Sequence, residues 1–207
     1  MCDIATMLDS TAREIGLDYD EHAITKCVEY ISLLYTWNKR TNLVGKQTQY
    51  EIASDLCIDS IHLAYILQHT QYPMHNIVDC GAGAGIPGIP LRCFYTLGTY
   101  TMIECREKRV LFIESALRRL MLQDTLCKEG RVEDICPHLT FDTIVSRAFM
   151  PPEKLLPFAS QFLQQGQYLI LMLHTDTIPM EGYEHIYSYS YVVADKERYI
   201  CILQKQH

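Results

Sequence analysis

A run of glycines directly after a short apolar segment limits the fold of this chain more than any other feature. Residues 76–80 read Asn-Ile-Val-Asp-Cys, and the β-branched pair in this segment suits a strand covered on both faces. Gly81, Gly83 and Gly85 follow at alternate positions, and Pro87 stands where a helix can begin. Alternate glycines let a backbone turn tightly and approach a ligand, because no Cβ is in the way. The segment therefore predicts a strand, a ligand-binding loop whose N–H groups face a polar ligand, and a helix.

Two cofactor classes use a loop of this kind. Residues 83–88 match G-x-G-x-x-G, which is typical of dinucleotide-binding folds. In the other register Asp79 lies two residues before three alternating glycines, which resembles motif I of the S-adenosylmethionine-dependent methyltransferases. There the acid at the strand end faces the methionine ammonium of the cofactor. We favour this register because the glycines begin directly after the strand, and an NAD-dependent oxidoreductase is the alternative.

The rest of the chain predicts an α/β fold. Helical periodicity indicates helices before residue 70, the last of them over 48–69. Strands at 76–80, 100–103, 125–128, 141–145 and 168–173 alternate with helices, which predicts a parallel sheet. Residues 187–193 and 199–203 predict a terminal antiparallel hairpin, which fits methyltransferases better than dehydrogenases. We expect a Rossmann-like class I methyltransferase sheet with helices on both faces, over residues 73–207, and an N-terminal helical extension over 1–72.

Composition narrows the class of protein. The chain has 207 residues, 48% of them hydrophobic, which supports one compact unit with a sizeable core. No apolar run reaches about 18 residues, and the start lacks the pattern of a signal peptide, so we expect a cytoplasmic protein without a membrane span. Nine scattered cysteines with no C-x-x-C indicate reduced thiols and no metal site.

Two charged residues lie where strands are predicted to end, at the edge where open α/β sheets bind ligands. Glu104 ends the second strand, 19 residues after Gly85, and an acid at this point accepts hydrogen bonds from ribose hydroxyls in both cofactor classes. Arg147 ends the fourth strand. It is either a ligand clamp or an ion-pair partner, for example of Asp79 or Glu104.

Charge is distributed unevenly along the chain. The net charge is −7, and residues 1–70 carry five basic and ten acidic side chains. Residues 92–131 carry eight basic and five acidic side chains. This basic stretch indicates either a solvated helix face or a local phosphate-binding surface on an acidic protein.

Several short segments occur together in an order that resembles the RsmG (GidB) family, bacterial methyltransferases that act on guanine N7 in small-subunit ribosomal RNA. The resemblance covers nearly the whole chain and rests on Trp37-Asn38-Lys39 with Asn42-Leu43, Asp59-Ser60, residues 79–90, Lys108-Arg109, residues 131–134, Phe141-Asp142, residues 146–148 and Glu197-Arg198. It implies S-adenosyl-L-methionine as cofactor. In the family the cofactor is held at positions matching Gly81, Ile86, Val132, Glu133 and Arg147, which we add to Asp79, Gly83, Gly85 and Glu104.

The resemblance also implies a mechanism and a partner. Guanine N7 carries an in-plane lone pair, so alignment of acceptor and methyl donor can supply most of the catalysis without a general base or a metal. Arg147 would orient the donor or the guanine. The partner would be small-subunit ribosomal RNA or the small ribosomal subunit, bound by a monomer, with phosphates met by Lys39, Arg40, Arg92, Arg106, Lys108, Arg109 and His174.

The chain departs from the family pattern at three places. Leu56 stands where the family has a histidine, Val44 where it has a threonine, and His174-Thr175 where it favours Lys-Gly. The changes leave the predicted cofactor residues intact and bear on how the substrate is positioned. A methyltransferase with another RNA target and a non-catalytic ribosome- or RNA-binding relative are therefore further alternatives.

Overall fold

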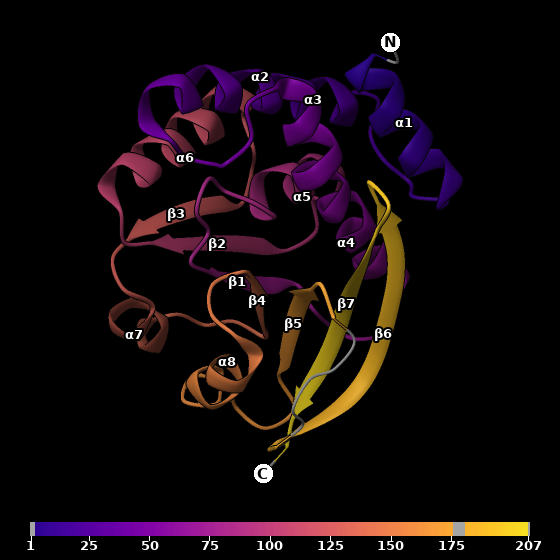
Figure 1. The fold of residues 1–207 in the computed structure, drawn as a ribbon. Helices are drawn as coiled ribbons and strands as arrows, with labels where there is room; N and C mark the ends of the chain where they lie inside the picture. The colour runs from indigo at the N-terminus through magenta and orange to yellow at the C-terminus, as the bar shows by residue number, and fades with distance from the viewer. Residues whose placement is uncertain (1–2, 176–180, 207) are drawn as a thin grey trace.

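The protein, a computed structural model, is described over residues 3–175 and 181–206. Within these residues, seven strands form one sheet in the order β3-β2-β1-β4-β5-β7-β6 (Figure 1). The strands are β1 (Asn76–Cys80), β2 (Thr99–Glu104), β3 (Thr125–Glu129), β4 (Thr143–Arg147), β5 (Tyr168–Leu173), β6 (Tyr183–Val193) and β7 (Lys196–Lys205). The first five are parallel, and β7 pairs antiparallel with both β5 and β6.

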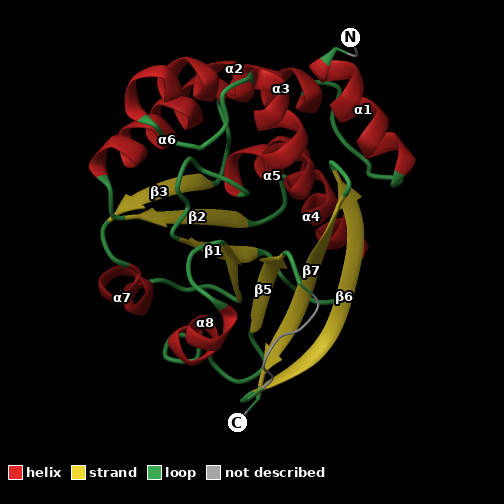
Figure 2. Ribbon diagram, viewed as in Figure 1, coloured by secondary structure: helices red, strands yellow, loops and turns green. Residues whose placement is uncertain are grey.

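Helices cover both faces of the sheet (Figure 2). One face carries α1 (Ile4–Glu14), α2 (Ala23–Thr41), α3 (Gln49–Ile52), α4 (Ile58–His69), α5 (Gly88–Phe94) and α6 (Glu107–Leu120). The other carries α7 (Val132–Ile135) and α8 (Pro152–Ala159). None of the helices in the described part of the chain is long and apolar enough to cross a membrane. The predicted α/β fold with a parallel sheet and a terminal hairpin is confirmed.

The core follows the two-residue period of the strands. On β1, Ile77 packs in the cluster under the N-terminal helices, whereas Val78 packs with α7 and α8. The larger cluster runs without a break from Leu8 in α1 to Ile202 in β7. Residues 1–72 and the sheet therefore share one apolar core over the residues described.

The predicted helix over 48–69 is one helical run with an irregular middle. It begins at Gln49, where Thr48 and Glu51 form a capping box, and ends at His69. Between α3 and α4, residues Ala53–Cys57 form a π-helical turn. A π turn inserts one residue into the helical repeat, which hydrophobic periodicity alone does not reveal. Asp59 lies directly after this turn, in the first turn of α4.

Candidate active site

The glycine loop follows β1 as predicted, but its amides are used inside the protein. Gly81, Gly83 and Gly85 have φ of +72°, +62° and +76°, which favours glycine at all three positions. The Gly81 and Ala82 amides each donate to the Ile103 carbonyl at 3.0 Å. The Gly83 amide donates to Glu104 Oε2 at 2.9 Å. The prediction that these N–H groups face a ligand is therefore wrong for the structure described, in which the loop instead offers close approach.

Three cavities open around this loop and meet at Ala148. The β2 cavity, of about 450 Å³, is lined by Gly81, residues 103–106, Arg109, residues 130–133, Ala148 and Phe149. The loop cavity, of about 300 Å³, is lined by residues 43–46, Leu56, residues 81–84, Ile86, Arg109, Arg147 and Ala148. The β5 cavity, of about 470 Å³, is lined by Asp59, residues 147–152, residues 172–175, Tyr191 and Arg198.

Glu104 lies where the sequence predicts, at the carboxyl end of β2. Its side chain is 4% exposed and lines the β2 cavity. The carboxylate accepts hydrogen bonds from the Gly83 amide and from the Arg106 amide, each at 2.9 Å. Arg109 Nη1 lies 3.4 Å from the same carboxylate. Glu104 therefore ties the glycine loop to the start of α6 and presents a fixed negative charge to the cavity.

Six of the other eight predicted cofactor residues also line these cavities. Gly83 and Ile86 line the loop cavity, and Val132 and Glu133 line the β2 cavity. Gly81 lines both of these cavities, and Arg147 lines the loop cavity and the β5 cavity. Gly85 lines none of the three and packs against Ile89 beneath the loop.

Asp79 does not reach any of the three cavities. Its carboxyl is buried under the glycine loop, where the Tyr100 hydroxyl donates to it at 3.1 Å. Burial raises the pKa of Asp79 to about 7, although the hydrogen bond from Tyr100 and the charge of Arg147 act in the opposite direction. The prediction that Asp79 faces the methionine ammonium is not supported, because its buried carboxyl has the Tyr100 hydroxyl and the Gly88 amide as partners within the core.

Arg147 is held by a residue of the N-terminal helices. Its Nη2 and Nε lie 2.9 and 3.1 Å from Asp59 Oδ2, and the Tyr191 hydroxyl donates to Asp59 Oδ1 at 2.9 Å. Burial raises the pKa of Tyr191, and the charge of Asp59 raises it further. The ion-pair partners Asp79 and Glu104 that the sequence suggests are thus wrong. Arg147 is nevertheless also at a ligand site, since it lines both the loop cavity and the β5 cavity.

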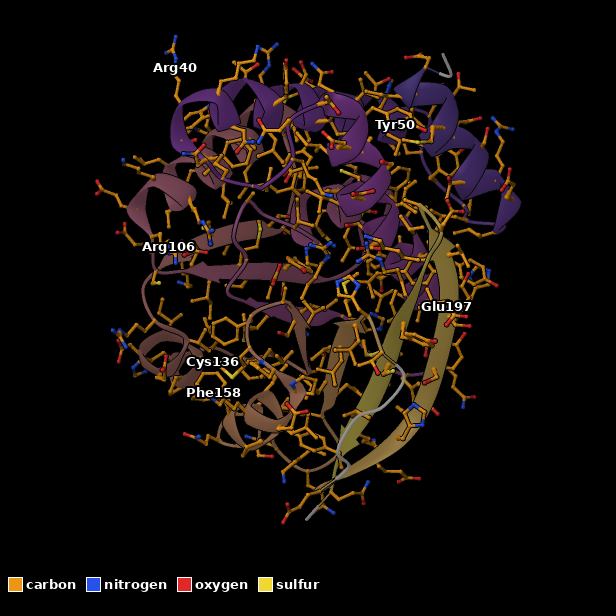
Figure 3. The ribbon with its side chains drawn as sticks, viewed as in Figure 1. Arg40, Tyr50, Arg106, Cys136, Phe158 and Glu197 are labelled. Atoms are coloured by element: carbon orange, nitrogen blue, oxygen red, sulfur yellow. The ribbon has the colours of Figure 1, made fainter. Side chains whose placement is uncertain are left out.

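Seven residues were predicted to meet RNA phosphates. Five of them, on or beside α2 and α6, are at least partly exposed. Lys39, Arg40, Arg106 and Lys108 are exposed, and Arg109 is half-buried beside Glu104. Figure 3 shows Arg40 projecting away from the end of α2, and Arg106 lies at the start of α6.

The sixth, Arg92, is 3% exposed, and the prediction is wrong for it. Its guanidinium donates to the Thr125 hydroxyl and to the carbonyls of Thr96, Leu97, Gly98 and Gln123. Arg92 therefore fixes the turn before β2 to the start of β3 and cannot meet a phosphate.

His174, the last predicted RNA contact, lies at the mouth of the β5 cavity. Its ring nitrogens lie 2.8 and 3.0 Å from Arg198 Nη1. Burial lowers the pKa of His174, and the neighbouring charge of Arg198 lowers it further, so the imidazole is neutral at neutral pH.

Sequence reasoning did not find Phe149, Tyr191 or the Asp59–Arg147 pair. Phe149 lines the β2 and β5 cavities, and its ring occupies the space that a Cβ on Gly81 would fill. Its position directly after Arg147-Ala148, at the carboxyl edge, is a signal that could have found it. Tyr191 comes from a strand far along the chain, and no local pattern connects it with Asp59.

Comparison with known proteins identifies the family. A family model described as rRNA small subunit methyltransferase G matches residues 23–198. The chain belongs to this family. A relative named ribosomal RNA small subunit methyltransferase G, from Nitratidesulfovibrio vulgaris, is 40% identical over 174 residues, which cover 83% of this chain and 79% of that protein. A relative of the same name from Lawsonia intracellularis is 34% identical over 197 residues, or 93% of this chain and 91% of that protein.

Solved structures agree with this membership at the level of the fold. The magnesium protoporphyrin IX methyltransferase from Synechocystis, solved with bound SAM, has a TM-score of 0.57 at 13% identity, over 86% of this chain and 97% of that one. A mutant of MtNAS in complex with S-adenosylmethionine has a TM-score of 0.62 at 12% identity, over 99% and 96% of the two chains. The family member described here thus has the fold of these two proteins, and the cofactor bound in both of them is S-adenosylmethionine.

The residues present fit this cofactor. A Cβ at Gly81 would collide with the Phe149 ring, so only glycine at this position lets the loop and Phe149 line the β2 cavity together. A buried carboxylate, Glu104, faces the β2 cavity, where ribose hydroxyls need an acceptor. The loop cavity continues from there past Gly83 to Arg147, which gives an elongated ligand a path along the carboxyl edge of the sheet.

Proposed function

We propose that this chain transfers a methyl group from S-adenosylmethionine to N7 of one guanine in small-subunit ribosomal RNA. The observation that carries the proposal is the junction at Ala148. There the glycine-lined cavities for a cofactor open beside the β5 cavity, which has room for a base. Family membership supplies the substrate class, since the relatives are named for the ribosomal RNA of the small subunit.

The β2 cavity and the loop cavity would hold the cofactor. Gly81, Val132 and Glu133 would surround the adenosine, and Glu104 would accept from the ribose. Gly83 and Ile86 would line the path of the methionine end, with Arg147 at its far side. Asp79 and Gly85 line neither cavity and would not touch the cofactor. They would act from beneath the loop.

When bound, S-adenosylmethionine supplies a methyl group on a sulfonium sulfur, which passes to guanine N7 while the electron pair of the C–S bond stays on sulfur. The N7 lone pair forms the new bond, so the protein moves no proton and the positive charge passes to the guanine. What the protein must supply is alignment, which is worth several kcal/mol when reacting groups are well oriented. Arg147 is suited to this because Asp59, which itself accepts from the Tyr191 hydroxyl, fixes its side chain.

The RNA would approach over the basic residues near the cavities. Lys39 and Arg40, at the end of α2, and Arg106 and Lys108, at the start of α6, are exposed and can each meet a phosphate. Because the net charge is −7, we infer that a folded RNA surface or an assembled small subunit is recognised rather than RNA in general. We further propose that the protein is monomeric and cytoplasmic.

The test is methyl transfer from labelled S-adenosylmethionine into small subunits that lack their native N7 methylation, with naked RNA in parallel. Incorporation at N7 of a single guanine is the expected result. Arg147→Ala should lower turnover by at least about tenfold, because alignment is lost, whereas Arg13→Ala, on the exposed face of α1, is the matched control. Cofactor binding without transfer would instead favour a changed target or a non-catalytic relative. Binding of NAD in place of S-adenosylmethionine would reject the proposal.

A further inference from the structure

Among the residues that the structure describes, Arg198 is a buried cation without a carboxylate partner. It lies on β7, is 8% exposed and lines the β5 cavity. Among the described residues its Nε has no hydrogen-bond partner, and none of the ion pairs includes it. Its Nη1 contacts the neutral His174 ring. A buried donor without an acceptor is costly, so an arginine in this state indicates a site built for an acceptor that arrives with a ligand.

The one carboxylate that lines the β5 cavity among the described residues is already in use. Asp59 Oδ2 accepts from Arg147, and Asp59 Oδ1 accepts from the Tyr191 hydroxyl. The cavity thus holds two arginines and one carboxylate, and the excess charge and the unpaired donor are both on Arg198. Its missing partner is therefore an electronegative oxygen or an anion.

The residues that line the β5 cavity favour a base over a phosphate as the group that contacts Arg198. The walls of the cavity are formed largely by the apolar and aromatic side chains of residues 149–152 and 172–173. Phosphates are met by exposed basic groups in water, whereas bases taken out of a stack lie against aromatic and apolar surfaces. A volume of about 470 Å³ is in the range of cavities that enclose small ligands.

We propose that Arg198 is a specificity-determining residue that donates a hydrogen bond to O6 of the acceptor guanine in the β5 cavity. O6 and N7 are neighbouring acceptors on one edge of guanine, so a donor at O6 leaves N7 directed toward the junction at Ala148. Adenine carries an amino group in place of O6, and this donor would face the guanidinium. The inference rests on the proposed function, because it names how that site selects its base.

The test uses small subunits reconstituted on ribosomal RNA that carries guanine, 2-aminopurine or inosine at the methylated position. 2-Aminopurine lacks O6, inosine lacks the 2-amino group, and both keep N7. The variants are Arg198→Met, which keeps bulk without a donor, Arg198→Lys, which keeps the charge, and Arg13→Met as a surface control. Transfer rates are measured with each RNA, and S-adenosylmethionine affinity is measured by calorimetry.

We expect Arg198→Met to lower kcat/KM on guanine by about 10- to 100-fold, the range of one good base contact. On 2-aminopurine the same variant should lose less than about threefold, because the contact is already absent there. Inosine should behave as guanine does with every variant. Arg198→Lys should recover part of the rate on guanine, and cofactor affinity should stay unchanged.

Equal losses on guanine and 2-aminopurine would overturn the O6 contact. If the salt dependence of binding also falls by about one unit, the oxygen met by Arg198 is a phosphate. Should Arg198→Met fail to fold, Arg198→Lys provides the same comparison, and equal losses with it overturn the assignment likewise. Absence of transfer by the unaltered chain into guanine-bearing subunits would instead refute the proposed function itself.

Discussion

Replacing Asp79 by asparagine should change how the stability of this protein depends on pH. Asp79 is 1% exposed, and burial raises the pKa of its carboxyl to about 7 from an ordinary value of 3.8. Between these values the folded state keeps a proton that the unfolded state has released. The contribution of Asp79 to stability is therefore fully present below about pH 4 and is lost as the pH rises through about 7, the reverse of a salt-bridged aspartate.

The magnitude follows from the size of the shift. At about 1.4 kcal/mol per pKa unit, the difference between 3.8 and about 7 corresponds to about 4 kcal/mol over the whole range. Between about pH 5 and pH 8 the loss is about 3 kcal/mol. Asparagine cannot ionise, and its amide oxygen can still accept from the Tyr100 hydroxyl. The stability of Asp79→Asn relative to the original chain should therefore rise by about 3 kcal/mol over this interval.

Urea denaturation followed by circular dichroism, at half-unit steps of pH, measures this difference directly. Asp134→Asn, on the exposed surface of α7, is the matched control and should leave the pH profile unchanged. The comparison within each variant removes any constant cost of the substitution. If the difference between Asp79→Asn and the original chain stayed constant within about 0.5 kcal/mol across the interval, Asp79 would not be a buried, protonatable acid and the reasoning would be refuted.

Three further outcomes follow from the contacts described. Gly81→Ala should weaken S-adenosylmethionine binding, measured by calorimetry, at least about tenfold. Alanine at φ +72° costs about 1–2 kcal/mol, and its Cβ collides with Phe149. An unchanged affinity would contradict the proposal that the glycine loop binds the cofactor. Arg92→Met should lower the free energy of unfolding, measured by urea denaturation, by about 3 kcal/mol, because it leaves buried acceptors unpaired. The RNA affinity of the folded protein should stay the same. A weaker RNA affinity would show that Arg92 contacts RNA after all. Asp59→Asn should lower the free energy of unfolding by about 2 kcal/mol, because Arg147 loses its charged partner. The rate of single-turnover methyl transfer should fall at least about tenfold for the same reason. An unchanged rate would show that Arg147 does not need Asp59 to hold its side chain.

The fold was largely predictable because its signals are local. Ile77 and Val78 before three glycines predict a strand and a loop, and the alternation of strands and helices after them predicts the parallel sheet. The π turn at Ala53–Cys57 was not predictable, since its residues Ala-Ser-Asp-Leu-Cys carry no breaker such as glycine or proline and fit a regular helix equally well. The last strands begin earlier than predicted, at Tyr183 and Lys196, because polar residues continue the pairing beyond the apolar stretch.

The site was predictable where one motif carries it and not where distant segments meet. Glu104 could be placed from its distance to the glycines and its strand-end position. Arg92, by contrast, has the same charge as its exposed neighbours in sequence, and only tertiary contacts show that it is buried. Likewise, nothing near Arg147 in sequence indicates that its partner is Asp59, 88 positions away.

The contact between Tyr191 and Asp59 joins residues 132 positions apart, and this has a consequence for the order in which the protein matures. A chain emerging from the ribosome presents Asp59 and the glycine loop long before Tyr191 and Arg198 exist. The β5 cavity takes both of these residues from the terminal hairpin. An incomplete chain can therefore carry the glycine loop and Glu104 but not a complete β5 cavity. Under the role proposed for Arg198, the capacity to select a substrate base is the last property that synthesis confers on this chain.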